Sequence, residues 1–136
     1  MFAPLHQLGW DPTMERVAGT KQYNITVRDN EDRERKYRTL RLVSCPKIEA
    51  LRGTATRVWE CVPLDARGRT VRNKRVALKD TWSDLDRRQE GDTYTELRAH
   101  ASPPQREILN KHLLTVEFHG IVYVDEQPAT DRKSVV

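Results

Sequence analysis

Apolar and polar side chains alternate along much of this chain, with the period of two that half-buried β-strands have. Residues 22–28 set Tyr23, Ile25 and Val27 against polar neighbours and predict one such strand. Short apolar runs bounded by glycine, proline and charged residues predict others. These further strands are expected at 36–43, 53–62, 74–79, 113–118 and 120–124, with the last two broken at His119-Gly120.

The strand at 36–43 offers Tyr37, Leu40 and Leu42 to a core. Between it and the preceding strand, the charged run at 29–35 predicts a solvated hairpin loop. Asp11-Pro12 predicts a turn in an extended N-terminal segment. The last residues, 125–136, are polar, so we expect a frayed tail.

Two helices are predicted between the strand at 74–79 and the strand at 113–118. Ser83-Asp84-Leu85-Asp86 can cap a helix over roughly 86–100, and Ser102-Pro103-Pro104 opens a second helix through about His112. Residues 47–51 suggest a short turn or helix. Strands joined in sequence by short loops, followed by helices, predict an α+β fold with an antiparallel β-sheet and one or two helices.

The 136 residues are enough for one small domain with a core. Charged residues make up 32% and the net charge is +4, which permits but does not demand an anionic partner. Cys45 and Cys61 stand alone, so a disulfide framework and a zinc site are not expected. Without an apolar run near 18 residues or a signal pattern, we expect a soluble protein of the cytoplasm or nucleus and no membrane partner.

The strongest chemical signal is the run Val76-Ala77-Leu78-Lys79, an apolar strand that ends in a lysine. Lysine is seldom buried without a partner, so Lys79 needs an anion from the fold or from a ligand. Protein kinases use this pattern to hold the phosphates of ATP. The structural alternative is a lysine at the edge of a strand with its ammonium group in water.

Two other features stand in the order that such a phosphate site needs. Gly53 heads a turn whose backbone amides could cover phosphates, although Ala55 stands at the second position of the usual Gly-x-Gly. A helix carboxylate must then hold Lys79. Glu90 and Glu96 both compete for this role, about 120° apart on the helix, so only one of them can face inward.

Six segments together resemble the fungal-type protein kinase family, in the family's order and over nearly the whole chain. They are Gly-Trp-Asp-Pro-Thr-Met (9–14), Tyr-Arg-Thr-Leu-Arg-Leu (37–42), Gly-Thr-Ala-Thr-Arg-Val-Trp-Glu (53–60), Val-Ala-Leu-Lys-Asp-Thr-Trp (76–82), Glu-Gly-Asp (90–92) and Leu-Leu-Thr-Val-Glu-Phe-His-Gly (113–120). The resemblance implies an N-terminal extension with a β-hairpin at 1–48 and part of a kinase-like small lobe at 49–136.

The resemblance also implies a nucleotide site with ATP and Mg²⁺ as cofactors. Lys79 would contact the phosphates with Glu90 as its partner, and Val58 and Ala77 would contact the adenine ring. The whole implied set is Gly53, Thr56, Val58, Ala77, Lys79 and Glu90. The full-length family would transfer the γ-phosphate of ATP to Ser or Thr hydroxyls of a protein substrate.

The sequence lacks the His-Arg-Asp, Asp-Phe-Gly and Ala-Pro-Glu motifs of kinases. The catalytic base and the metal-holding residues belong to those motifs. We therefore expect no catalytic residue, no metal ligand and no phosphoryl transfer from this chain alone. It is expected to be the N-terminal part of a kinase: a truncated gene model, a fragment or a degenerate copy.

Two other functions remain open. A basic β-rich module could bind nucleic acid or another protein, with support from a cationic cluster at Arg67, Arg69, Arg72, Lys74 and Arg75. A non-catalytic lobe could also self-associate through apolar surface left bare on 116–124.

Four further residues are expected to have structural roles. Trp59 and Trp82 are expected to pack as buried aromatics, and Cys61 as a small core residue. His119 is expected to lie exposed in a turn at a strand end, because no nucleophile motif accompanies it.

Overall fold

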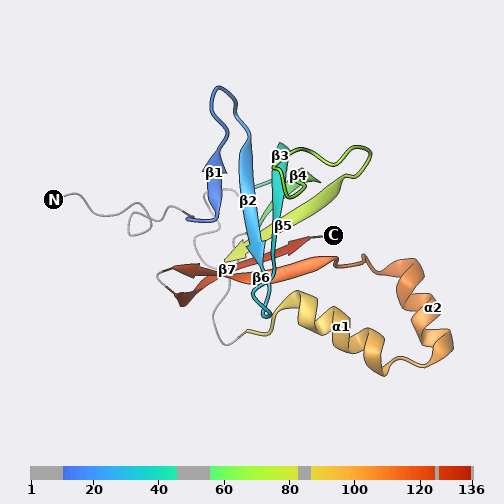
Figure 1. Ribbon diagram of the computed structural model, residues 1–136. Coiled ribbons are helices and arrows are strands. Elements are labelled where there is room, and N and C mark those ends of the chain that lie inside the picture. The colour runs from blue at the N-terminus through green and yellow to red at the C-terminus, as the bar shows by residue number, and fades with distance from the viewer. Residues whose placement is uncertain (1–10, 46–55, 83–86, 125, 136) are drawn as a thin grey trace.

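The computed structural model describes residues 11–45, 56–82, 87–124 and 126–135 (Figure 1). One seven-stranded sheet of order β1-β2-β3-β4-β5-β7-β6 runs through them, and every neighbouring pair is antiparallel. The strands are β1 (Met14–Arg16), β2 (Tyr23–Arg28), β3 (Glu34–Ser44), β4 (Thr56–Pro63), β5 (Val76–Trp82), β6 (Phe118–Val124) and β7 (Gln127–Val135). Two helices, α1 (Glu90–His100) and α2 (Pro103–His112), connect β5 to β6. The predicted α+β fold is confirmed.

The core forms where the period-two pattern turns apolar side chains to one face of the sheet. Ile25 and Val27 of β2 are buried there, as the alternation predicts. The buried apolar residues of this cluster are Met14, Ile25, Val27, Tyr37, Cys61, Val76, Leu78, Phe118 and Val135, with Tyr23 and Trp59 packed against it. Since these side chains come from all seven strands, a single core serves the whole described sheet.

The sheet curls until β2 lies against β6, although the two strands are not neighbours in the sheet. Gly120 makes this approach possible, because a Cβ there would lie 1.6 Å from the carbonyl oxygen of Arg28. The Arg28 guanidinium lies over the Tyr123 ring, 5.3 Å from its centroid, and Arg35 lies 4.7 Å from the Phe118 centroid. Cation–π contacts of this kind hold the β2–β3 hairpin to β6.

The C-terminal prediction was wrong in two places. Residues 113–117 form no strand, and β6 runs without a break from Phe118 through His119-Gly120 to Val124. The expected frayed tail is instead β7, which lies inside the sheet between β5 and β6. This segment was missed because its sequence, Gln-Pro-Ala-Thr-Asp-Arg-Lys-Ser-Val, is polar, and polar strands give no periodic signal.

Three predicted core residues are more exposed than expected. Leu40 is 37% exposed, Leu42 is 44% exposed, and Trp82 at the end of β5 is 42% exposed. The β3–β4 register shifts between Thr39 and Arg41, so the alternation of sides is interrupted beyond Thr39. As a result Tyr37 and Thr39 fill the core from this strand.

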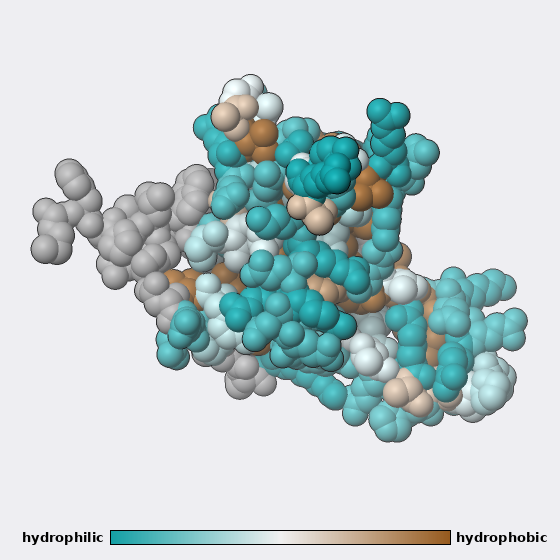
Figure 2. Space-filling view, viewed as in Figure 1, coloured by the Kyte–Doolittle hydropathy of each residue, from teal (hydrophilic) through white to brown (hydrophobic). Residues whose placement is uncertain are grey.

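The helices extend away from the sheet (Figure 1) and expose apolar side chains. The expected bare surface on 116–124 is not found, because Phe118 and Val122 are buried. Exposed large apolar residues lie instead at Leu97, Ile108 and Leu114. Figure 2 shows a largely hydrophilic face with small apolar areas. Self-association of the chain therefore stays a prediction.

Helix α2 begins with the predicted serine cap. The Ser102 side chain and backbone form a capping box with Gln105, whose Oε1 accepts from the Ser102 amide at 2.9 Å. Helix α1 starts at Glu90, four residues later than expected, after Gln89 in an extended conformation. The predicted cap at 83–86 lies outside the described residues. No helix in the described ranges combines the length and apolarity that crossing a bilayer requires.

Candidate functional site

Strands β4 and β5 together present one face that the core does not use. On β5 the buried residues Val76, Leu78 and Asp80 alternate with the half-buried Ala77 and Lys79. Lys79 is therefore not at the end of its strand, as the sequence suggested, but in the middle of it. Its side chain leaves the sheet on the side opposite the core.

The pairing of the two strands gathers the predicted site residues on this face. Val58 is directly opposite Lys79, and Thr56 is opposite Thr81, with 3.3 Å between the two hydroxyl oxygens. Ala77 lies two residues before Lys79 and so on the same side. Gly53 lies outside the described residues, so its position over this face stays a prediction.

Lys79 on this face forms an ion pair with Glu90, the first residue of α1. The Lys79 Nζ lies 2.5 Å from Glu90 Oε2, and the Tyr94 hydroxyl donates to Glu90 Oε1 at 3.3 Å. Glu96 instead pairs with Arg88, which decides between the two glutamates. The Lys79 and Glu90 side chains are 36% and 42% exposed, so the pair adds little to stability and remains accessible from solvent.

The first turn of α1 sits directly on β6. Gly91 is buried, and a Cβ there would lie 2.2 Å from the Cδ2 of His119. Gln89 and Asp92 flank the same imidazole ring, with Gln89 Oε1 3.2 Å from Nδ1 and Asp92 Oδ1 3.8 Å from Nε2. The expectation of an exposed turn histidine was wrong, because His119 lies within β6 with a side chain 21% exposed.

The face that carries Thr56, Val58, Ala77 and Lys79 is called the Lys79 face below. On the opposite side of the sheet lies a buried charge network that the sequence did not reveal. Asp80 is fully buried and accepts from Lys133 of β7 at 2.9 Å. Lys133 also donates to Asp11 at 2.7 Å, and Arg57 of β4 forms an ion pair with Asp80. In the sequence each of these residues looks like an ordinary surface charge. Asp80 and Lys133 come together because β5 pairs with β7.

The pKa values of Asp11 and Cys61 depart from their ordinary values. Burial alone would raise the pKa of Asp11, but the charge and hydrogen bond of Lys133 and the hydrogen bonds of Thr13 together lower it from its usual value. Burial raises the pKa of the Cys61 thiol to about 12. Cys61 is therefore a protonated core residue, as expected, and not a nucleophile.

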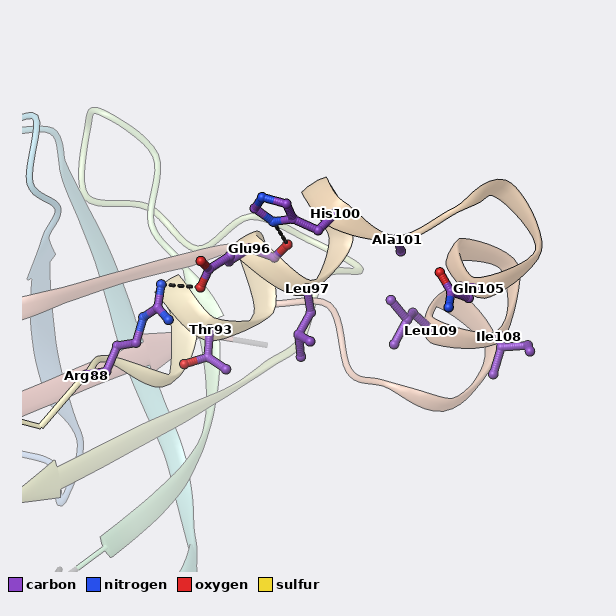
Figure 3. Close-up of a pocket in the computed structure, with 9 residues that line it drawn as sticks. All are labelled: Arg88, Thr93, Glu96, Leu97, His100, Ala101, Gln105, Ile108 and Leu109. Carbon is purple, nitrogen blue, oxygen red and sulfur yellow. Dashed lines mark hydrogen bonds and ion pairs between the residues drawn. The ribbon is translucent and has the colours of Figure 1, made fainter.

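A separate hollow of about 690 Å³ lies between α1 and α2 (Figure 3). Leu97, Ile108 and Leu109 give it an apolar lining, and the Arg88–Glu96 ion pair lies at its edge. None of the six predicted site residues lines it. This hollow is therefore distinct from the Lys79 face.

The donors on the Lys79 face fit a nucleotide better than a protein-bound metal ion. A lysine ammonium held by a carboxylate suits phosphate oxygens, and half-buried Val58 and Ala77 suit an aromatic ring. Within the described ranges, no group of three or more His, Cys, Asp or Glu side chains could hold a metal ion. We would therefore expect Mg²⁺ to be bound by the phosphates of the nucleotide.

No curated protein and no solved structure matched this sequence. The family model described as "Fungal protein kinase" matches residues 1–133, nearly the whole chain. Gly53, strand β5 with Lys79 and helix α1 with Glu90 all lie within that match, and the chain belongs to the fungal protein kinase family.

Proposed function

We propose that this chain provides the phosphate-holding part of a protein kinase ATP site. The observation that carries the proposal is the 2.5 Å ion pair between Lys79 Nζ and Glu90 Oε2, on the sheet face that also presents Val58 and Ala77. The helix carboxylate fixes the ammonium group, which can then donate to the α- and β-phosphates. Val58 and Ala77 offer apolar contact to the adenine ring.

The loop around Gly53, together with Thr56, would cover the phosphates and exclude water from them. ATP supplies the transferable phosphoryl group, and the Mg²⁺ bound to it neutralises phosphate charge. In the full-length family the acceptor would be a Ser or Thr hydroxyl of a protein substrate. The motifs that supply the base and the metal-holding residues are not in these 136 residues, so the proposal concerns nucleotide binding and not catalysis.

The alternative of a nucleic-acid module has less support from the contacts of its cationic cluster. Arg69 pairs with Asp65, Lys74 with Glu117 at 2.8 Å, and Arg75 with Glu60 at 2.6 Å. Cations already paired with carboxylates must give up those pairs, or share their charge, before they can neutralise phosphates, so they add less to nucleic-acid binding.

Titration of the chain with a fluorescent ATP analogue and Mg²⁺ tests the proposal. Lys79→Ala should weaken binding by at least about tenfold, as expected for loss of one charge-assisted hydrogen bond. Glu90→Gln should also weaken it, whereas the matched control Glu96→Gln should leave it unchanged, because Glu96 pairs with Arg88. Equal affinity of the wild type and Lys79→Ala would show that the lysine does not hold a phosphate.

A further inference from the structure

The Lys79–Glu90 pair depends on where α1 begins, because Glu90 is the first residue of that helix. A helix terminus tends to fray unless something holds it. Gln89 makes no side-chain cap hydrogen bond to this helix, although the Thr93 amide donates to its carbonyl oxygen at 3.2 Å. The position of Glu90 must therefore be set by contacts between the first turn and the sheet.

Those contacts converge on one imidazole. The ring of His119 occupies the space that a side chain at position 91 would need, with Cγ, Cδ2 and Nε2 all within 2.6 Å of an added Cβ. Gln89 and Asp92 approach its two ring nitrogens from either side of Gly91. Gln89 before Glu90, and Gly91 and Asp92 after it, thus all approach one side chain of β6, and Gly91 is the only buried residue of α1.

We propose that Gly91 and His119 form a seat that positions Glu90 for its ion pair with Lys79. Glycine is required at position 91 because the imidazole lies against the helix backbone there. His119 is a positioning residue: it contacts neither Lys79 nor the predicted nucleotide and acts through the first turn of α1. The consequence for nucleotide binding rests on the proposed function, whereas the consequence for the ion pair does not.

If Gly91 and His119 form this seat, Gly91→Ala should weaken nucleotide binding although it does not weaken the helix. Alanine favours helix formation over glycine by roughly 1 kcal/mol, so a purely structural effect of this change would strengthen α1. A methyl group at this position must instead displace the ring or the helix, and Glu90 then moves away from Lys79. We expect the ATP analogue to bind about tenfold more weakly while the helix content by circular dichroism is kept or raised.

A double-mutant cycle tests the seat directly. In Gly91→Ala/His119→Ala the ring is absent, so the methyl group has room, and affinity should recover to that of His119→Ala alone. His100→Ala is the matched control, since it also places alanine in α1, but His100 is exposed at the far end of the helix and its ring bonds to the Glu96 carbonyl oxygen, so this variant should bind like the wild type. Additive losses in the double variant would overturn the proposal.

A second readout needs no nucleotide. The ¹⁵Nζ signal of the Lys79 ammonium group is observable when an ion pair slows its exchange with water, and it should weaken in Gly91→Ala and return in the double variant. An unchanged signal in Gly91→Ala would overturn the proposed seat. If the signal follows the cycle but no protein binds the ATP analogue, the seat is supported and the proposed nucleotide function fails.

Discussion

Replacing Lys133 by methionine should lower the free energy of unfolding more than almost any other single substitution would. Methionine has a similar length and can fill the space of the buried stem, so the change removes the charge with little loss of volume. The Lys133 side chain is 2% exposed and donates to Asp80 at 2.9 Å and to Asp11 at 2.7 Å. Its removal leaves two buried carboxylates facing each other without that cation.

Breaking a buried ion pair by removing one partner costs about 3–5 kcal/mol. Asp80 keeps Arg57 as a partner, so we expect a loss of about 3 kcal/mol in the free energy of unfolding. Urea denaturation followed by tryptophan fluorescence measures it. Lys111→Met on the exposed face of α2 is the control and should change stability by less than about 0.5 kcal/mol. A loss below about 1 kcal/mol in Lys133→Met would refute the view that Lys133 is a structural counter-ion.

The same variant should respond differently to acid. In the wild type the folded pKa of Asp11 is lowered, so its contribution is present above the unfolded pKa and is lost as the pH falls through the folded pKa. In Lys133→Met the burial remains without the cation, so the folded pKa of Asp11 is higher than in the wild type. The variant then loses less stability than the wild type as the carboxylate is protonated, and the stability gap should narrow between about pH 5 and pH 3. A constant gap across this range would count against the coupling.

Two further changes test other parts of the fold. Gly120→Ala places a Cβ 1.6 Å from the Arg28 carbonyl oxygen, so β6 must move from β2 at a cost of about 1–3 kcal/mol in urea denaturation, and an unchanged midpoint would contradict the close approach. Ser102→Ala removes half of the capping box with Gln105 and should cost α2 about 1 kcal/mol, seen as faster amide hydrogen exchange in that helix alone. Equal exchange rates in the two proteins would show that the cap does not stabilise α2.

The sequence predicted those parts of the fold whose signals are local. Strands β2, β3, β4 and β5 follow from alternation and turn residues, and α2 follows from its serine cap, all within a few positions of one another. The kinase pattern left Glu90 and Glu96 as candidate partners of Lys79, helix geometry allowed only one of them to face inward, and the structure selects Glu90. These features need no knowledge of distant segments.

What the sequence could not predict depends on pairing between segments far apart. Lys133 and Asp80 are 53 residues apart, and each looks like a surface residue until β7 lies beside β5. The role of Gly91 was hidden for the same reason, because the ring that requires it comes from β6. The exposure of Leu42 follows a shift in register within β3 that no local pattern marks.

The place of β7 inside the sheet has a consequence for how the protein is made. Strands β5 and β6 do not pair with each other, so the backbone groups along one side of the lysine strand have no partner until residues 127–135 have been synthesised. A sheet edge left open in this way is a site for pairing with other nascent chains. We therefore expect the ribosome-bound chain to need protection by a chaperone until β7 inserts beside β5.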